Sequence, residues 1–329
     1  MNFDSKKLVG YGTGITMLGT IEAFPLDFNY FIDDNEGVVG QQIMERPIYP
    51  SSKLLEEKPN AVFIVVFASN YKSTLKIFEK LIQLDLRKGE DFIDCFELQY
   101  LTIAEKLERE MSISSDYKLL NTIKTATGNA PVPNLSTPTG TWLYSHLLRQ
   151  ALREIDGDIA ECGVYFGGNA LITHQSLPEV SERRYHLFDS FEGFENISAN
   201  DPKSRGGDFQ DNDFEFVKSL FKSFPNVVFH KGYFNETFEE MQPRDYALVY
   251  IDCDLYEPTI ECLDYFGEKV LPGGMILIHD YWFPNIERPK GSKSHFEGIQ
   301  KAVKEYTEHR NDFDILVFPE TTHCLLIKK

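Results

Sequence analysis

The sequence lacks any apolar run near the ~20 residues that a membrane-spanning helix needs. Its five cysteines show no CxxC spacing, so we expect neither a disulfide framework nor a cysteine zinc site. Basic residues are fewer than acidic ones, since the chain has 33 Lys and Arg but 51 Asp and Glu. A formal net charge of −18 repels phosphate backbones, which argues against nucleic acid as a partner. Without a signal-like N-terminus, a cytoplasmic protein that makes no membrane contact is expected.

What the chain does contain is a pair of α/β patterns, and 329 residues accommodate two domains. Residues 1–97 predict a small α/β Rossmann-like domain. Residues 156–329 alternate strands and helices regularly, which predicts a doubly wound parallel sheet. Residues 98–155 are interpreted as a helical and loop-rich linker, with a lid as the alternative. Three prolines in this stretch, the last of them Pro138, oppose a regular helix.

The last two strands of the expected sheet lie close together in the sequence. FDILVFP and HCLLIKK are separated by only a few residues, whereas a parallel crossover needs about a dozen or more. An antiparallel hairpin is therefore predicted at the end of the parallel sheet.

The first candidate site lies in ECGVYFGGN, where a strand meets a helix. Gly163, Gly167 and Gly168 let the backbone approach a ligand closely, and the helix N-terminus offers free N–H groups to a carboxylate. Glu161 stands just before these glycines. The spacing differs from the dinucleotide GxGxxG pattern, and glycines used only for the shape of the turn are the alternative.

The next predicted strand ends in FDSFEGF, which carries Asp189 and Ser190. An acidic residue at this point of a doubly wound sheet accepts hydrogen bonds from the ribose of a nucleoside cofactor. The alternative for Asp189 is a cap of the following turn. Taken with the glycine turn, the pair predicts a cofactor site.

Four polar residues follow two further strands of this sheet. IDCDLYEPT carries Asp252 and Asp254, and HDYW carries His279 and Asp280. The carboxyl ends of parallel strands meet at one edge of a sheet, so we expect these side chains to lie close together. The like charges of the aspartates then need a cation or a proton between them. Oxygen ligands suit magnesium, calcium or manganese, and a histidine favours transition metals. The sequence thus predicts a divalent metal site.

These motifs, ECGVYFGG, FDSFEGF, IDCDLYEPT and HDYW followed by FEGIQKAV, resemble the macrocin O-methyltransferase (TylF-like) family over about residues 135–329. The resemblance implies an S-adenosylmethionine (SAM)-dependent enzyme that methylates a sugar hydroxyl. It also implies magnesium held by three aspartates, with a further aspartate as the base. By motif, Asp252 and Asp280 would be metal ligands and Asp254 the base.

One residue departs from the family pattern, because His279 stands where the family has an aspartate. An imidazole would then replace one carboxylate ligand. It would coordinate as a neutral group and shift the preference from magnesium toward manganese or iron, or it would leave the metal weakly bound.

Aromatic residues of the loops are candidates for apolar walls around the adenine and the sugar, with burial in the core as the alternative for several of them. They include Trp142, Tyr144, Phe191, Phe194, Tyr281 and Trp282.

The N-terminal domain more loosely resembles small nucleotide-binding-like domains found beside enzymes of sugar-nucleotide biosynthesis. Gly10, Gly12 and Gly14 favour a phosphate loop, but no basic residue follows them closely, so a scaffold or dimerisation role is the alternative. A rival overall function is a sugar-nucleotide- or NAD-binding protein whose C-terminal unit only recognises a ligand. The preferred interpretation has a small-molecule acceptor, a sugar, as its partner and is compatible with a homo-oligomer.

Overall fold

The computed structural model describes the chain except for residues 1–5, 15–16, 18–20, 22–25, 59–60, 69–70, 96, 99–115, 133, 135, 137, 196, 202–205, 282–296 and 319–320. It divides into two compact units, Met1–Ser112 with Thr127–Asn129, and Ile113–Ala126 with Ala130–Lys329. Within the described part, no helix combines the length and the apolar character needed to cross a bilayer.

The N-terminal unit contains a six-stranded sheet of order β3-β4-β2-β1-β5-β6. Strands β1, β2, β4, β5 and β6 run parallel, whereas β3 pairs antiparallel with β4. The fully buried strand β5 is followed in the chain by helix α2. The β3–β4 hairpin was not predicted, because its two strands are short and mostly exposed. The elements are β1 (Lys7–Tyr11), β2 (Tyr30–Ile32), β3 (Gln42–Ile43), β4 (Arg46–Tyr49), the 3-10 helix η1 (Ser51–Glu56), β5 (Val62–Val66), α2 (Tyr71–Gln83) and β6 (Phe92–Asp94).

The C-terminal unit contains a seven-stranded sheet of order β12-β13-β11-β10-β7-β8-β9. Five strands are parallel, and β13 runs antiparallel to both β11 and β12. The predicted doubly wound sheet and its terminal hairpin are confirmed. The strands are β7 (Asp158–Cys162), β8 (Tyr185–Asp189), β9 (Val227–Lys231), β10 (Tyr246–Ile251), β11 (Val270–Ile278), β12 (Phe313–Phe318) and β13 (His323–Lys328).

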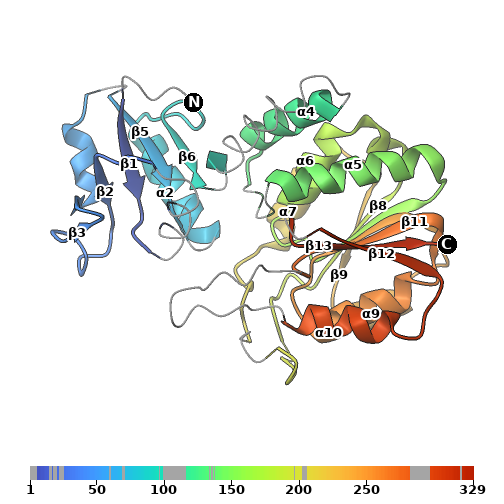
Figure 1. Cartoon of the computed structure of the whole chain (residues 1–329). Coiled ribbons are helices and arrows are strands. Elements are labelled where there is room, and N and C mark those ends of the chain that lie inside the picture. Colours follow the sequence, from blue (N-terminus) through green and yellow to red (C-terminus); the bar gives the residue numbers. More distant parts are fainter. Residues whose placement is uncertain are drawn as a thin grey trace. The chain divides into compact units, whose positions relative to one another are not determined.

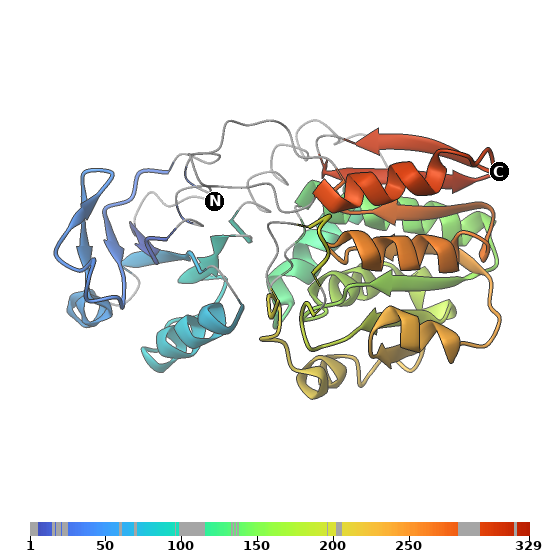
Figure 2. The same cartoon turned by 90° about the horizontal axis from the view of Figure 1, so that it is seen from below.

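Helices cover both faces of this sheet, with α5 and α6 on one side and α9 and α10 on the other (Figure 1). Figure 2 looks onto the α9–α10 face, where Phe188, Phe266 and Ile299 belong to the buried core. The helices are α4 (Asp116–Asn129), α5 (Pro138–Glu154), α6 (Gly168–Ser176), η2 (Pro178–Glu182), α7 (Phe214–Leu220), α8 (Phe234–Glu239), α9 (Tyr256–Phe266) and α10 (Glu297–Thr307).

One local expectation is corrected by α5. Pro138 was placed in a loop because proline interrupts helices, but it is the first residue of α5. Proline is tolerated there, since the first helical N–H has no partner within the helix and the fixed φ suits helix entry. Helix α8, only six residues long, was missed between β9 and β10.

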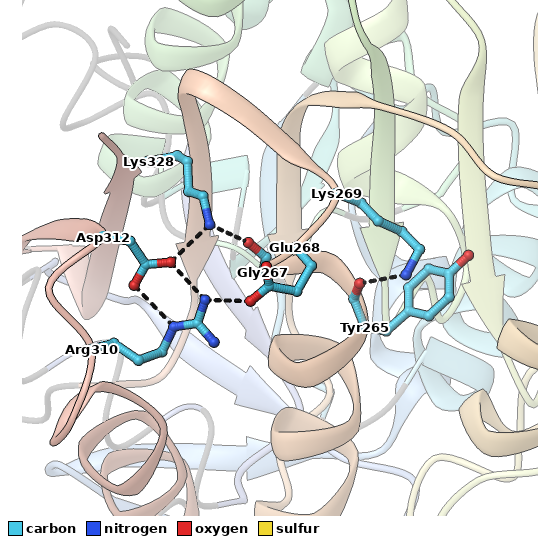
Figure 3. Close-up of polar contacts among 7 residues, drawn as sticks. All are labelled: Tyr265, Gly267, Glu268, Lys269, Arg310, Asp312 and Lys328. Atoms are coloured by element: carbon cyan, nitrogen blue, oxygen red, sulfur yellow. Dashed lines mark hydrogen bonds and ion pairs between the residues drawn. The ribbon is translucent and has the colours of Figure 1, made fainter.

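A cluster of charged side chains ties the β12–β13 hairpin to the end of α9 (Figure 3). The Asp312 carboxylate accepts hydrogen bonds from Arg310 Nη2 (2.6 Å) and Lys328 Nζ (2.8 Å). Arg310 also donates to Glu268, and Lys328 Nζ donates to the carbonyl of Gly267 at 2.8 Å. These contacts join three segments that are separate in the sequence.

Strand β12 forms one edge of the sheet, and β13 is its neighbour there. Three consecutive apolar residues of β12, Ile315, Leu316 and Val317, are 47%, 48% and 41% exposed. The strand therefore depends on a single neighbour for its backbone pairing.

We expect Asp312→Asn to lower the stability of the protein by about 0.5–1 kcal/mol at pH 7, a range typical of solvent-accessible ion pairs, because 37% of the Asp312 side chain is exposed. Hydrogen bonds from Arg310 hold the pKa of Asp312 below its usual value. Its contribution is therefore fully present above the ordinary carboxyl pKa near 4 and is lost progressively as the pH falls from there through the lower pKa of the folded state. Urea midpoints at pH 7 and in a series from pH 4 downward measure both effects.

Asp314→Asn is the matched control, because the ion pair described for Asp314 is with Lys329 and its side chain is 68% exposed. The control should leave the urea midpoint nearly unchanged. Equal midpoints for wild type and Asp312→Asn at pH 7 would contradict a stabilising network.

Candidate active site

The glycine turn after β7 is held by close backbone contacts. Gly163 has φ +89°, and a Cβ at this position would lie 1.9 Å from the carbonyl oxygen of Asp252. Gly167, at φ +76°, is the N-cap of α6, which starts at Gly168. Only glycine fits at Gly163 without moving the Asp252 backbone, so the turn and the end of β10 are fixed relative to each other.

Glu161 is a buried carboxyl group at the base of this turn. It is 1% exposed, and its Oε2 accepts hydrogen bonds from Tyr185 Oη at 2.5 Å and Asn169 Nδ2 at 3.2 Å. The Tyr144 and Tyr185 hydroxyls lie 3.0 Å apart. Burial, assisted by the charges of Asp252 and Asp189, raises the pKa of Glu161 to about 8. A cationic ligand group would favour its charged form.

Asp189 ends β8 and clamps the same turn. Its Oδ2 accepts the N–H groups of Val164 (2.8 Å) and Tyr165 (2.9 Å), and its Oδ1 accepts that of Phe191 (2.7 Å). The capping role weighed for this residue is therefore present. Ser190 Oγ accepts the N–H of Glu192 at 3.2 Å.

Asp252, His279 and Asp280 form a cluster at the ends of β10 and β11. One potential ligand atom from each lies within 4.8 Å of the others. His279 Nδ1 is 2.8 Å from Asp252 Oδ1 and 3.4 Å from Asp280 Oδ1. Burial lowers the pKa of His279, but the two carboxylates outweigh it and the pKa rises to about 9. A proton on the His279 imidazole thus offsets the negative charges of Asp252 and Asp280.

Asp254 lies beside this cluster with an unusual backbone. Its φ is +64°, and that of Asp280 is +55°. Left-handed conformations are costly for residues other than glycine and concentrate at functional sites. Burial, then the charges of Asp252 and Asp280, raise the pKa of Asp254 well above its usual value.

All these groups meet at one cavity of about 740 Å³, a volume typical of small-molecule sites. Its described lining residues come from the stretch between Asn134 and Thr322. Every site residue proposed from the sequence lines it except Gly167. Those in the lining are Glu161, Gly163, Gly168, Asp189, Ser190, Asp252, Asp254, His279 and Asp280.

Of the aromatic candidates, Phe194 lines the cavity. Tyr144 and Phe191 are buried, and Trp142 and Tyr281 are absent from the lining as described. Trp282 lies outside the described residues.

Sequence reasoning missed several residues behind the site. The rings of His279 and His323 lie 4.7 Å apart, and Tyr250 Oη is 3.4 Å from His323 Nε2. His323 is fully buried in β13. A histidine at the start of this last apolar strand was a signal that could have identified His323, because the sequence already placed that strand beside the parallel strands.

The glycine turn of the N-terminal unit is held by the chain's own carboxylates. Asp33 Oδ2 accepts both the N–H (2.9 Å) and the hydroxyl (2.7 Å) of Thr13. Asp34 accepts from Tyr11 Oη and Lys80 Nζ. The acidic residues after β2, where a ribose would be expected, therefore already have partners.

The relatives found by comparison with known proteins are named as O-methyltransferases. The chain is 28% identical over 140 residues to 8-demethyl-8-(2,3-dimethoxy-alpha-L-rhamnosyl)-tetracenomycin-C 4′-O-methyltransferase of Streptomyces olivaceus, covering 39% of this chain and 54% of that protein. It is 26% identical over 191 residues to mycinamicin III 3″-O-methyltransferase of Micromonospora griseorubida, covering 52% and 69%. The match thus spans about half the length of the first of these relatives.

Among solved structures, the O-methyltransferase NovP is 22% identical, with a TM-score of 0.49, over 71% of this chain and 98% of that one. A family profile, macrocin-O-methyltransferase (TylF), matches residues 75–308. This region begins earlier than residue 135 and contains every site residue proposed from the sequence. Because it covers well over half of the sequence, the chain belongs to the macrocin-O-methyltransferase (TylF) family.

Proposed function

We propose that this protein is a SAM-dependent O-methyltransferase that acts on a sugar hydroxyl of a small molecule with the help of a divalent metal. The observation that carries the proposal is that one cavity contains both the glycine turn after β7 and the Asp252–His279–Asp280 cluster. Family membership supports methyl transfer to oxygen. The names of the tetracenomycin and mycinamicin relatives support a glycosylated acceptor.

The cofactor would bind along the turn. The N-terminus of α6 offers N–H groups to the SAM carboxylate, and Glu161 offers a buried acceptor to its amino group. Asp189 accepts three backbone hydrogen bonds, and a carboxylate has about four acceptor positions. One position therefore remains for a ribose hydroxyl, beside Ser190.

The metal would be held by Asp252, His279 and Asp280. The donor set fits, because two carboxylates and one imidazole converge on one point and their charges need a cation or proton. His279 must be neutral to coordinate, so the ion would replace its proton. When bound, the ion would polarise the acceptor hydroxyl and lower its pKa.

Asp254 would be the general base. In methyl transfer the acceptor oxygen forms a bond to the methyl carbon while the carbon–sulfur bond breaks, and S-adenosylhomocysteine (SAH) leaves with an uncharged sulfur. The hydroxyl proton goes to the Asp254 carboxylate. In-line geometry and proton removal are what the enzyme must supply.

Calorimetry with SAH tests the cofactor site, and one SAH per chain is expected. A panel of neutral glycosides with SAM, monitored by SAH formation, then tests the activity. A wild-type protein that binds no SAH would overturn the proposal.

Asp254→Asn should slow methyl transfer by about 100-fold or more, because it removes basicity while keeping the size of the side chain. Asparagine also tolerates the left-handed backbone. SAH affinity should change less than about twofold, because the base makes no proposed contact with the cofactor. Single-turnover rates with the best acceptor of the panel provide the measurement. The control is Asp264→Asn, an exposed position on α9, and an Asp254→Asn variant as fast as this control would exclude the base.

His279→Ala should weaken Mn²⁺ binding by about tenfold or more, because one of three protein ligands is lost. His279→Asp should restore binding and move the preference toward Mg²⁺, since a harder oxygen site favours the harder ion. Calorimetry and electron paramagnetic resonance of Mn²⁺ with the SAH-bound protein report binding directly. His309→Ala, at an exposed position, is the control. Unchanged Mn²⁺ affinity in His279→Ala would remove His279 from the ligand set.

A further inference from the structure

A line of buried hydroxyl groups ends at Glu161, the carboxyl group assigned above to the amino group of the cofactor. Tyr144 on α5 and Tyr185 at the start of β8 are 1% and 0% exposed. Their hydroxyl oxygens lie 3.0 Å apart, and Tyr185 Oη is 2.5 Å from Glu161 Oε2. Neither tyrosine is among the described lining residues of the cavity. Both therefore act on a ligand in this cavity only through Glu161.

The direction of these hydrogen bonds follows from the number of protons available. An ionised carboxylate only accepts, so the single hydroxyl proton of Tyr185 points to Glu161. Tyr185 can then only accept from Tyr144, which makes Tyr144 the first donor of the line. A hydroxyl that itself accepts a hydrogen bond becomes a stronger donor, so Tyr144 strengthens the contact between Tyr185 and Glu161. The arrangement favours the ionised form of the carboxyl group.

The hydrogen bonds to Glu161 leave one of its oxygens unused. Those described end on Oε2, which also accepts from Asn169 Nδ2 at 3.2 Å. Among the described residues, Oε1 has no protein donor, and Glu161 and Asn169 both line the cavity. Asn169 Oδ1 likewise has no partner in the described part of the chain. Two unused acceptor oxygens on neighbouring side chains suit an ammonium group, which carries several N–H donors.

The surroundings of Glu161 oppose its ionisation while the cavity is empty. Burial, assisted by the charges of Asp252 and Asp189, raises the pKa of Glu161 to about 8. The hydrogen bonds from Tyr185 and Asn169 act in the opposite direction. The polar and titratable groups that face Glu161 from the neighbouring elements are Tyr144, Asn169, Tyr185, Asp189, Tyr250 and Asp252. None of these six is a cation, so a bound ammonium group would be the counter-charge of Glu161.

We propose that Tyr185, supported by Tyr144, is the positioning residue that holds Glu161 ready for the ammonium group of the cofactor, and that cofactor binding expels a proton from Glu161. The inference rests on the proposed function and assigns the pH dependence of cofactor binding to a residue outside the cavity. The carboxylic acid gives its proton to solvent, and the resulting carboxylate pairs with the ammonium group. Tyr185 promotes this step because its hydrogen bond is stronger to the charged carboxylate than to the neutral acid.

Calorimetry of SAH binding to the wild type, in buffers of different ionisation enthalpy, measures the proton release. At pH 7 we expect about one proton to leave for each SAH bound, because the empty site is mostly protonated there. The affinity should therefore rise about tenfold for each pH unit between pH 6 and 7.5, and level off above pH 8. An SAH affinity that depends on neither pH nor buffer would contradict the proposal.

Tyr185→Phe removes the hydroxyl donor and keeps the ring. SAH affinity at pH 7 should fall about tenfold or more, since a hydrogen bond to a charged group is lost. The pH above which the affinity levels off should rise by about one unit. Tyr144→Phe, which acts one step further from Glu161, should cause the same changes to a smaller extent. In a Glu161→Gln background, Tyr185→Phe should change the affinity by less than about twofold, because the carboxylate through which it acts is gone.

Two controls separate this role from a general effect on folding. Tyr246→Phe removes a buried hydroxyl of the same sheet for which the described residues offer no hydrogen-bond partner, and it should change neither the affinity for SAH nor its pH profile. 5′-Methylthioadenosine lacks the amino-acid part of SAH. Its affinities for the wild type and for Tyr185→Phe should therefore agree within about twofold.

Three results would overturn the inference. In the first, Tyr185→Phe keeps the affinity and the pH profile of the wild type. In the second, this variant weakens methylthioadenosine as much as SAH. In the third, it causes an equal loss in the Glu161→Gln background, which would make Tyr185 a purely structural residue. Absence of SAH binding in the wild type would instead overturn the proposed function itself.

Discussion

The contact between Gly163 and the carbonyl oxygen of Asp252 is the constraint on which the site depends. Strands β7 and β10 are neighbours, and the N–H of Asp252 donates to Cys162 O at 2.8 Å. The glycine turn therefore begins against the backbone that carries Asp252 and leads to Asp254. Any side chain at Gly163 would separate the groups assigned to the cofactor from those assigned to the acceptor. The reacting atoms of a methyl transfer must meet within about 3–3.5 Å, so this packing sets the geometry of the chemistry.

Much of this arrangement could be predicted from the sequence, because it follows from strand ends. Residues 159–162 of β7, all of β10 and the last three residues of β11 are buried without interruption, and parallel neighbours bring their carboxyl ends to one edge. The short link between β12 and β13 allowed only a hairpin. What could not be predicted was set by tertiary contacts. The hydrogen bond of Tyr185 to Glu161, the approach of His323 to His279 and the left-handed backbone of Asp254 have no local pattern. Helix α8 and the β3–β4 hairpin were too short for periodicity to identify.

Electrostatics divides the cavity into regions with different tasks. At the inner end, burial and then the neighbouring carboxylates raise the pKa values of Glu161 and Asp254, and a proton on His279 offsets the charges of Asp252 and Asp280. Toward Tyr165, Phe194 and Phe209, which also line the cavity, the walls stay acidic but gain apolar surface. An overall excess of carboxylates, visible in the composition as 51 acidic against 33 basic residues, is thus concentrated where the proposed ligands carry positive charge. The composition argued against nucleic acid as a partner.

The order of the strands has a consequence for synthesis on the ribosome. β12 emerges before β13, yet β13 lies between β12 and the rest of the sheet. During that interval β12 has no strand to pair with, and Ile315, Leu316 and Val317 add apolar surface to an open edge. Such edges recruit strands from other chains. The connection between the two strands is only a few residues long, so the nascent chain passes through this vulnerable state briefly.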